Sequence, residues 1–166
     1  AGIGGTFLAL AAAGWLLVPV ASLMINHFDL FGSRQVWLHL KQKPYTMLAF
    51  RTPLLYRLVR HPLYTGNLLV LVGFTLASGQ WWAPLVAVAF WGFYYPTAIS
   101  YEDRKLHRIF GEPWEQWSAT VPAVIPRRFW PTGPASWSLM TSVRQNAEPV
   151  VIAVTLICIG WIGARV

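Results

Sequence analysis

The sequence predicts an all-α fold, a polytopic transmembrane helical bundle of about four spans with a cytoplasmic helix after the third. Of its 166 residues, 55% are hydrophobic and 11% are charged, whereas a soluble domain carries about 25% charged residues. A chain of this size cannot enclose so much apolar surface in its own core. Ten tryptophans and six tyrosines also fit a membrane, because these rings favour its interface with water. We therefore expect residues 1–166 to form a single membrane domain.

Four apolar segments are the candidate spans, at about residues 6–24, 62–78, 82–100 and 149–163. About 20 helical residues cross the hydrocarbon core, so the first and third segments are long enough. The second and fourth segments are shorter and can cross it only if flanking residues are included. The first segment has the hydropathy of a signal peptide, but it is longer than a typical one and no basic stretch precedes it. We interpret it as a transmembrane helix.

The connections between these segments predict the topology. Only Gly79-Gln80-Trp81 separates the second from the third, which predicts a tight antiparallel hairpin. The loop at 26–60 and the region at 101–147 are both basic, and the hairpin tip is uncharged. The positive-inside rule places both basic regions in the cytoplasm. This also explains the net charge of +7 more simply than nucleic-acid binding, which the apolar composition disfavours.

The region after the third segment is expected to continue as a helix over about 102–117, broken near Gly111-Glu112-Pro113. Leu106, Ile109 and Phe110 have helical spacing and are expected to pack back onto the bundle. Residues 127–166 are interpreted as an interfacial loop rich in proline, glycine and tryptophan, followed by a C-terminal span.

The start of the second segment is the first candidate site. Pro62 suits the first turn of a helix, whose free N–H groups and dipole attract an anion. Arg60 adds positive charge, His61 exchanges hydrogen bonds near neutral pH, and Gly66 permits a ligand to approach the backbone. The alternative is that Arg60 and His61 only mark the interface and that Gly66 only packs helices.

The acidic pair Glu102-Asp103 follows the third segment and is the second candidate. Carboxylates accept hydrogen bonds from ribose hydroxyls or an amino group, although such pairs are more often a solvated face. Aromatic side chains nearby offer faces for a cation such as a sulfonium, namely Tyr56, Tyr64, Tyr94, Tyr95 and Trp114. The sequence contains no motif for the other common kinds of functional site. The histidines have no metal-ligand spacing, no phosphate loop or hydrolase motif is present, and the lone Cys158 excludes an internal disulfide.

Residues 26–126 resemble the isoprenylcysteine carboxyl methyltransferase superfamily of integral-membrane methyltransferases. The matching residues are Tyr56, the run Arg60-His61-Pro62-Leu63-Tyr64-Thr65-Gly66, the pair Glu102-Asp103, Leu106, Phe110-Gly111-Glu112, Val121-Pro122 and Ile125-Pro126. Residues 27–37 and 50–53 are similar to the methanethiol S-methyltransferase branch. The sequence also departs from the pattern, since the methanethiol branch usually has no tyrosine matching Tyr64, and Trp114 and Trp117 stand where tyrosines are common. Ala98, Ile99 and Ser100 stand where the family usually has an arginine, and residues 127–166 have no counterpart.

The resemblance implies S-adenosylmethionine as methyl donor, bound at the cytosolic edge of a membrane, with bacterial inner membrane as the expected location. It implies cofactor contacts from Tyr56, His61, Pro62, Leu63, Tyr64 and Glu102. Arg60 and Gly66 are further cofactor-binding candidates, because of the positive charge and the open backbone that they contribute. We assign no catalytic base and no metal ligand, because the sulfonium is already activated and binding geometry supplies most of the acceleration.

The predicted function is therefore methyl transfer to a small thiol or a lipophilic acceptor, with membrane lipids as the surroundings. The alternative is a non-catalytic structural subunit of a larger membrane complex, built on a methyltransferase-like scaffold. The missing arginine and the added tail favour that alternative. A small transporter or haem-handling protein is a third hypothesis, which the lack of charged residues within the spans disfavours.

Overall fold

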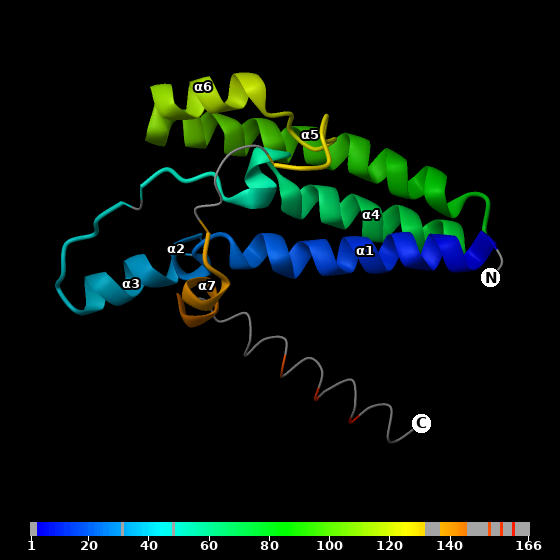
Figure 1. Cartoon of the computed structure of the whole chain (residues 1–166), viewed down its shortest axis with the longest axis horizontal. Coiled ribbons are helices and arrows are strands. Elements are labelled where there is room, and N and C mark those ends of the chain that lie inside the picture. The colour runs from blue at the N-terminus through cyan, green and yellow to red at the C-terminus, as the bar shows by residue number, and fades with distance from the viewer. Residues whose placement is uncertain are drawn as a thin grey trace. The chain divides into compact units, whose positions relative to one another are not determined.

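The computed structural model describes residues 3–30, 32–47, 49–131 and 137–145, with Ala153, Ile157 and Trp161 as single positions. Over these residues the secondary structure is helical and contains no strand, as expected (Figure 1). The chain divides into two compact units. One comprises residues 1–21 and 49–135, and the other comprises 22–48 and 136–166.

The first unit contains the predicted spans that the structure describes. Helix α1 (Ile3–Leu23) includes a stretch, Gly4–Leu23, of 20 residues and mean hydropathy 1.9, long and apolar enough to cross a membrane. Helix α4 (Pro62–Ala77) is apolar but shorter, with 16 residues. Helix α5 (Ala83–Phe110) covers the third predicted segment and continues beyond it. The number of spans stays a prediction, and most of the fourth, at 149–163, lies outside the described residues.

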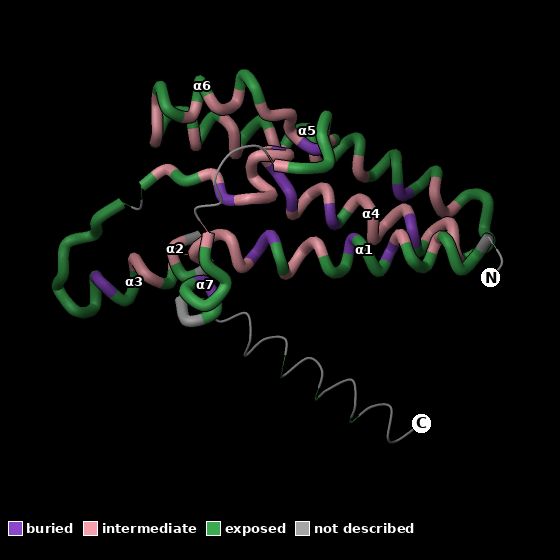
Figure 2. The backbone as a smooth tube through the Cα atoms, viewed as in Figure 1, coloured by how far each residue is buried: buried purple, intermediate pink, exposed green. Residues whose placement is uncertain are grey.

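Small residues bring α1 and α4 into backbone contact. A Cβ atom added to Gly14 would lie 2.6 Å from the carbonyl oxygen of Gly66, and one added to Gly73 would lie 2.5 Å from the amide nitrogen of Ala11. Such contacts are typical of helices that pack closely in membranes. Helix α5 instead exposes large apolar side chains, with Phe93 86% exposed, as expected of a surface that faces lipid. Figure 2 marks many positions along α5 as exposed.

Two glycines with positive φ end the helices of this unit where the sequence predicted. Gly79, with φ of 70°, lies in the short link between α4 and α5, which pack against each other as the expected hairpin. Gly111, with φ of 59°, separates α5 from α6 (Glu112–Thr120). Glycine adopts this left-handed conformation without the strain that a Cβ would cause. The helix expected over 102–117 is therefore confirmed, with its break at Gly111.

The segment at 26–60 was expected to be a loop, and this was wrong for parts of it. It contains α2 (His27–Leu30), α3 (Ser33–Leu40) and a 3₁₀ helix, η1 (Leu54–Arg57). Local polar contacts explain the helices. The side chain of Asn26 accepts the Asp29 N–H at 3.0 Å, and Asp29 in turn accepts from Arg34 at 2.9 Å. The second unit holds α2, α3 and α7 (Leu139–Gln145).

Candidate functional site

The N-terminus of α4 is held in place by an extended stretch from much later in the chain. The backbone N–H groups of Arg60 and His61 donate to the carbonyl oxygens of Pro122 and Ala123, at 2.8 and 2.9 Å. The Thr65 hydroxyl donates to the carbonyl oxygen of Val124 at 2.7 Å. Figure 1 shows this stretch, after α6, returning beside the start of α4. These bonds fix the backbone that carries the two basic residues.

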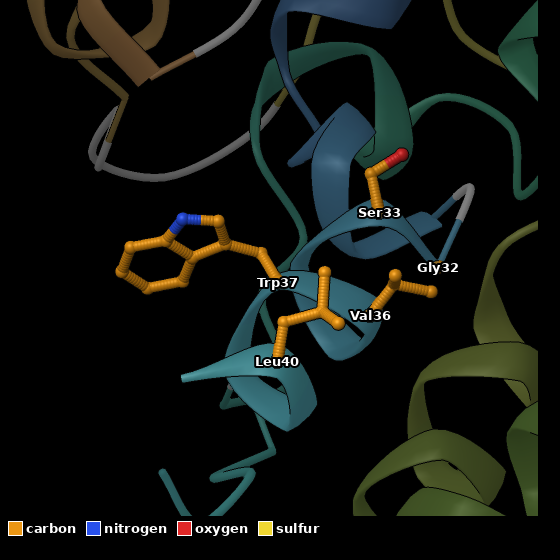
Figure 3. Close-up of a pocket in the computed structure, with 5 residues that line it drawn as sticks. All are labelled: Gly32, Ser33, Val36, Trp37 and Leu40. Atoms are coloured by element: carbon orange, nitrogen blue, oxygen red, sulfur yellow. The ribbon is translucent and has the colours of Figure 1, made fainter. Parts of the chain in front are cut away.

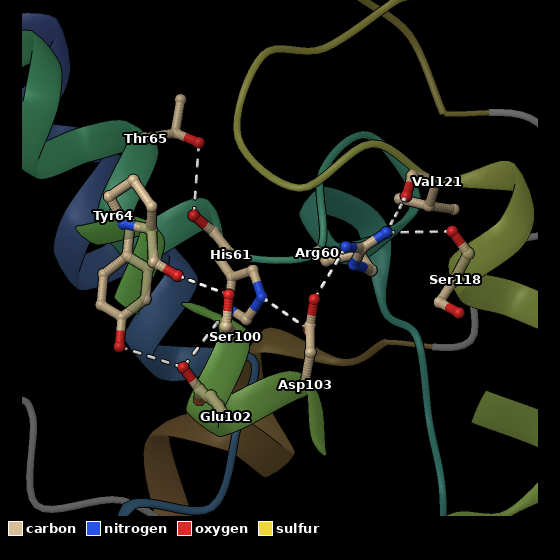
Figure 4. Close-up of polar contacts among 10 residues, drawn as sticks. Arg60, His61, Tyr64, Thr65, Ser100, Glu102, Asp103, Ser118 and Val121 are labelled. Carbon is tan, nitrogen blue, oxygen red and sulfur yellow. Dashed lines mark hydrogen bonds and ion pairs between the residues drawn. The ribbon is translucent and has the colours of Figure 1, made fainter. Parts of the chain in front are cut away.

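His61 lies between the two carboxylates of α5. Its Nε2 is 2.9 Å from Oδ1 of Asp103, and its Nδ1 is 3.4 Å from Oε2 of Glu102 (Figure 4). The residue is buried, with 5% of its surface exposed. The α4–α5 hairpin brings these groups together because His61 directly precedes α4 and the two carboxylates directly follow the apolar segment of α5. We name Arg60, His61, Tyr64, Glu102 and Asp103 the polar cluster.

Arg60 connects the cluster to α6. Its Nη2 donates to Oδ2 of Asp103 at 2.8 Å, and its Nη1 donates to the carbonyl oxygens of Ser118 and Val121, both at 3.0 Å. Carbonyl groups at a helix C-terminus lack intrahelical partners and carry partial negative charge, so a guanidinium stabilises them. Arg60 thus ties α5 and the end of α6 to the start of α4.

Tyr64 forms the aromatic side of the cluster. Its ring stacks on the imidazole of His61 with centroids 5.3 Å apart, and its hydroxyl donates to Oε2 of Glu102 at 3.0 Å. The ring of Tyr95 meets it edge-on at 5.0 Å. The stack and the hydrogen bond orient both the imidazole and the carboxylate.

The ionisable groups in the cluster shift one another's pKa values. Burial alone would lower the pKa of His61, but its hydrogen bonds to Asp103 and Glu102 and their negative charges raise it. Burial would raise the pKa of each carboxyl group, yet the contacts with His61 lower both, with Tyr64 adding to the effect on Glu102 and Arg60 to that on Asp103. The arrangement therefore favours a protonated imidazole between two carboxylates.

Tyr56 lies near this charge. Burial raises the pKa of its phenol, and the negative charge of Glu102 raises it further. Its backbone carbonyl accepts the indole N–H of Trp117 at 3.1 Å, which ties η1 to α6. The phenol is therefore un-ionised at neutral pH and remains a hydrogen-bond donor.

The structure brings three of the predicted site residues, His61, Tyr64 and Glu102, into direct contact, and Arg60 joins them through Asp103. Pro62 and Leu63 lie in the first turn of α4, and the side chain of Pro62 is fully buried. Gly66 lies against α1, where a Cβ would be 2.8 Å from Cγ2 of Val18. Helix packing alone accounts for this glycine. The cofactor role of all eight residues stays a prediction.

Asp103 is the residue whose importance the sequence did not reveal. It belonged to the acidic pair that was a candidate site, but it was not among the predicted cofactor-binding residues. In the structure it bonds to both Arg60 and His61 and so connects the two basic residues. The only available signal was its position next to Glu102. Spacing alone does not show which of two adjacent helical residues faces Arg60.

Two surface hollows are described elsewhere in the chain. In the second unit, one of about 310 Å³ is lined by Gly32, Ser33, Val36, Trp37 and Leu40 (Figure 3). All of these lie on α3 or directly before it, so this hollow is one face of a short helix. The other, in the first unit, has a volume of about 460 Å³ and three arginines in its wall. Neither hollow has a residue of the polar cluster in its wall.

This arrangement of polar groups at the ends of apolar helices agrees with a family match. The phospholipid methyltransferase family model matches residues 39–113, a range that contains the whole polar cluster. Residues 39–113 are therefore similar to a family of methyltransferases, and the resemblance expected from the sequence is confirmed.

The names of the matching relatives specify a methyl acceptor. A methanethiol S-methyltransferase of Crocosphaera subtropica is 43% identical over 126 residues, which cover 72% of this chain and 46% of the relative. Methanethiol S-methyltransferase 1 of Bradyrhizobium diazoefficiens is 39% identical, with 74% and 42% covered. A methanethiol S-methyltransferase of Mycobacterium tuberculosis is 36% identical, with 74% and 48% covered. The chain thus spans about half the length of these relatives. No solved structure matches it.

Proposed function

We propose that this protein is an S-adenosylmethionine-dependent membrane methyltransferase whose acceptor is a small thiol, with methanethiol as the first candidate. The observation that carries the proposal is the polar cluster, in which a carboxylate beside a buried histidine lies at the end of two packed apolar helices. The family match and the names of the relatives support the same reaction.

The residues present fit such a cofactor. Both described contacts of Glu102 use Oε2, and among the described residues no hydrogen bond or ion pair reaches its Oε1. The side chain is 35% exposed, so this oxygen remains available to a ligand. No hydrogen bond within the described ranges involves the Tyr56 hydroxyl, which lies near enough to Glu102 for its pKa to respond. An acceptor and a donor are therefore free where a nucleoside with two ribose hydroxyls would bind.

The cluster suggests a division of roles among the chain's own residues. Glu102 and Tyr56 would hold the donor's hydroxyl or amino groups, and the Tyr64 ring would offer its face to the sulfonium. His61 would orient Glu102, and Arg60 with Asp103 would hold His61 in place. Pro62 and Leu63 would form the wall at the helix start.

The chemistry that the donor supplies is a methyl group on a positively charged sulfur, which makes it reactive without an added acid. In the transfer, the thiol sulfur would form a bond to the methyl carbon while the bond from that carbon to the sulfonium sulfur breaks, and the thiol proton would pass to solvent. The protein's part is to hold the two sulfurs in line and to exclude water. For this reason we assign binding residues and no catalytic base.

We also propose that the cluster faces the cytoplasm of a bacterial inner membrane. The positive-inside rule supports this orientation, because basic residues are concentrated on both sides of the cluster in sequence. S-adenosylmethionine is made inside cells, so a site at this face would have access to it.

The test is calorimetric titration of the purified chain in detergent with S-adenosylmethionine. We expect micromolar binding in the wild type and a loss of at least about tenfold in Glu102→Gln and in Tyr56→Phe, because a lost hydrogen bond to a charged or buried group costs about 1.5–3 kcal/mol. Supplying methanethiol and donor should then yield dimethyl sulfide, detected by gas chromatography.

Asp29→Asn is the matched control. Asp29 also pairs with an arginine, Arg34, at 2.9 Å, but it lies in the second unit. This variant should keep wild-type cofactor affinity. No binding to wild-type protein at millimolar cofactor, together with co-purification in a fixed ratio with other membrane subunits, would replace the enzyme proposal with the structural one.

A further inference from the structure

The hollow of about 460 Å³ in the first unit combines positive charge with apolar side chains. Its wall is built from Arg57, Leu58, Thr120, Val121, Pro122, Arg127, Arg128 and Trp130. The residues come from the end of η1 and the position after it, and from the last residue of α6 and the stretch that follows. The backbone bond from Arg60 to Pro122 holds these two segments side by side. We name it the arginine hollow.

The positive charge of Arg127 and Arg128 in this hollow has no acidic partner among the described residues. No acidic residue lines it. The side chains of Arg127 and Arg128 are exposed, and no hydrogen bond or ion pair with another described residue is found for either. Arg57 adds a third guanidinium and is positioned by its Nε, which donates to the carbonyl oxygen of Thr52 at 3.0 Å. Clustered arginines of this kind bind phosphate oxygens well, since the guanidinium offers paired donors.

Large apolar side chains are close to these arginines in sequence, and one of them, Trp130, also lines the hollow. Phe129 and Trp130 are each 83% exposed, and Ile125 is 75% exposed. A soluble phosphate compound would gain nothing from them. A lipid would, because its acyl chains contact apolar and aromatic side chains while its headgroup meets the basic ones. Trp next to Arg is typical of segments that lie at the membrane interface.

We propose that the arginine hollow binds the phosphate group of an anionic membrane lipid, with Arg127 and Arg128 contacting the phosphate and Phe129 and Trp130 lying among the acyl chains. This site is separate from the polar cluster and goes beyond methyl transfer. The methyltransferase proposal can fail while this one holds, and the reverse is also true.

Native mass spectrometry of the full chain, released from detergent with added lipid, tests the proposal. The probes are phosphatidylglycerol and the zwitterionic phosphatidylcholine, with matched acyl chains. We expect the wild type to retain phosphatidylglycerol in preference. Arg127→Gln/Arg128→Gln should reduce that retention about tenfold or more, because each basic residue near an anionic lipid surface contributes substantially to binding.

Arg104→Gln/Lys105→Gln is the matched control, since it removes the same charge from exposed positions of α5 outside the hollow. It should retain phosphatidylglycerol as the wild type does. Equal losses in both double variants, or equal retention of the two lipids by the wild type, overturn the proposal. Inorganic phosphate at millimolar concentration should not displace the lipid, and displacement would assign the hollow to a soluble phosphate compound instead. Circular dichroism confirms that each variant is folded, and the single variants Arg127→Gln and Arg128→Gln replace the double one if it is not.

Discussion

The polar cluster and the arginine hollow lie on adjacent parts of the chain. They differ in whether their arginines have hydrogen-bond or ion-pair partners among the described residues. Arg60 in the cluster has a carboxylate and two carbonyl groups as partners. Arg127 and Arg128, after the same stretch that binds Arg60, have no described partner within the chain. A buried charge requires compensation during folding, whereas exposed charge can be left for a ligand. The cluster is thus part of what holds the unit together, and the hollow is available for binding.

The strongest test of this difference is Asp103→Asn. It leaves Arg60 and His61 partly buried without their shared carboxylate, so we expect the free energy of unfolding to fall by about 2–3 kcal/mol, somewhat less than for a fully buried pair. Denaturation in mixed detergent micelles measures this. The matched change in the hollow, Arg127→Gln/Arg128→Gln, should leave the unfolding midpoint unchanged. An equal loss of stability in both variants would contradict the view that the cluster stabilises the fold and the hollow does not.

The pH dependence of stability gives the next largest effect. The raised pKa of His61 means that its contribution is fully present below about pH 6.5 and is lost as pH rises through the higher folded value. The lowered pKa values of Glu102 and Asp103 mean that theirs is present above about pH 4.5 and is lost as pH falls through the lower folded values.

We therefore expect the unfolding temperature to be highest between roughly pH 4.5 and 6.5. Each unit by which the His61 pKa is raised corresponds to about 1.4 kcal/mol. Thermal scans over pH check this, and His61→Gln should lack the decline on the alkaline side. A wild-type profile that is flat from pH 6 to 9 would contradict a protonated imidazole between the carboxylates.

Two tryptophans beside the cluster provide a smaller contrast. Trp117 donates its indole N–H to the carbonyl of Tyr56 at 3.1 Å, whereas the buried indole nitrogen of Trp114 has no hydrogen-bond partner among the described residues. Trp117→Phe should therefore cost about 1 kcal/mol of unfolding free energy. Trp114→Phe should be neutral or slightly stabilising, since it removes an unsatisfied donor. Chemical denaturation of both variants would show whether the order is reversed.

The smallest expected effect concerns salt. Lipid retention in the arginine hollow should weaken severalfold between about 0.05 and 0.5 M salt, because exposed charges are screened beyond roughly 10 Å at 0.1 M. The unfolding midpoint should change little over the same range, because the partly buried pairs of the cluster are screened less. Parallel titrations on one preparation compare the two responses. Retention that does not depend on salt would mean that the apolar contacts alone hold the lipid.

Much of the candidate site was predictable because two helices joined by a short link must have adjacent ends. The link at 79–81 placed His61 and Glu102 at one end of a hairpin, and the structure has them in contact. The break at Gly111 was predictable from the Gly-Glu-Pro sequence. These features depend on local signals and on chain connectivity.

Other features were not predictable, because they depend on contacts across long separations in sequence. Nothing near Arg60 indicates that its guanidinium binds the carbonyl groups of Ser118 and Val121, 58 and 61 residues away. The helices α2 and α3 were missed because the basic residues around them are typical of a cytoplasmic loop. The Asn26 side chain at the start of α2 was the signal for a helix start, and it was not used.

The glycine contacts between α1 and α4 have a consequence for the surroundings of the site. Gly66 and Gly73 lie two turns apart on α4, and both touch the backbone of α1, so neither helix can slide along the other without a collision. Membrane proteins commonly adjust to bilayers of different thickness by tilting or shifting single helices. Here the pair must adjust together, so the level of His61 along α1 is set by protein packing. The same geometry around the imidazole is therefore expected in thin and in thick bilayers.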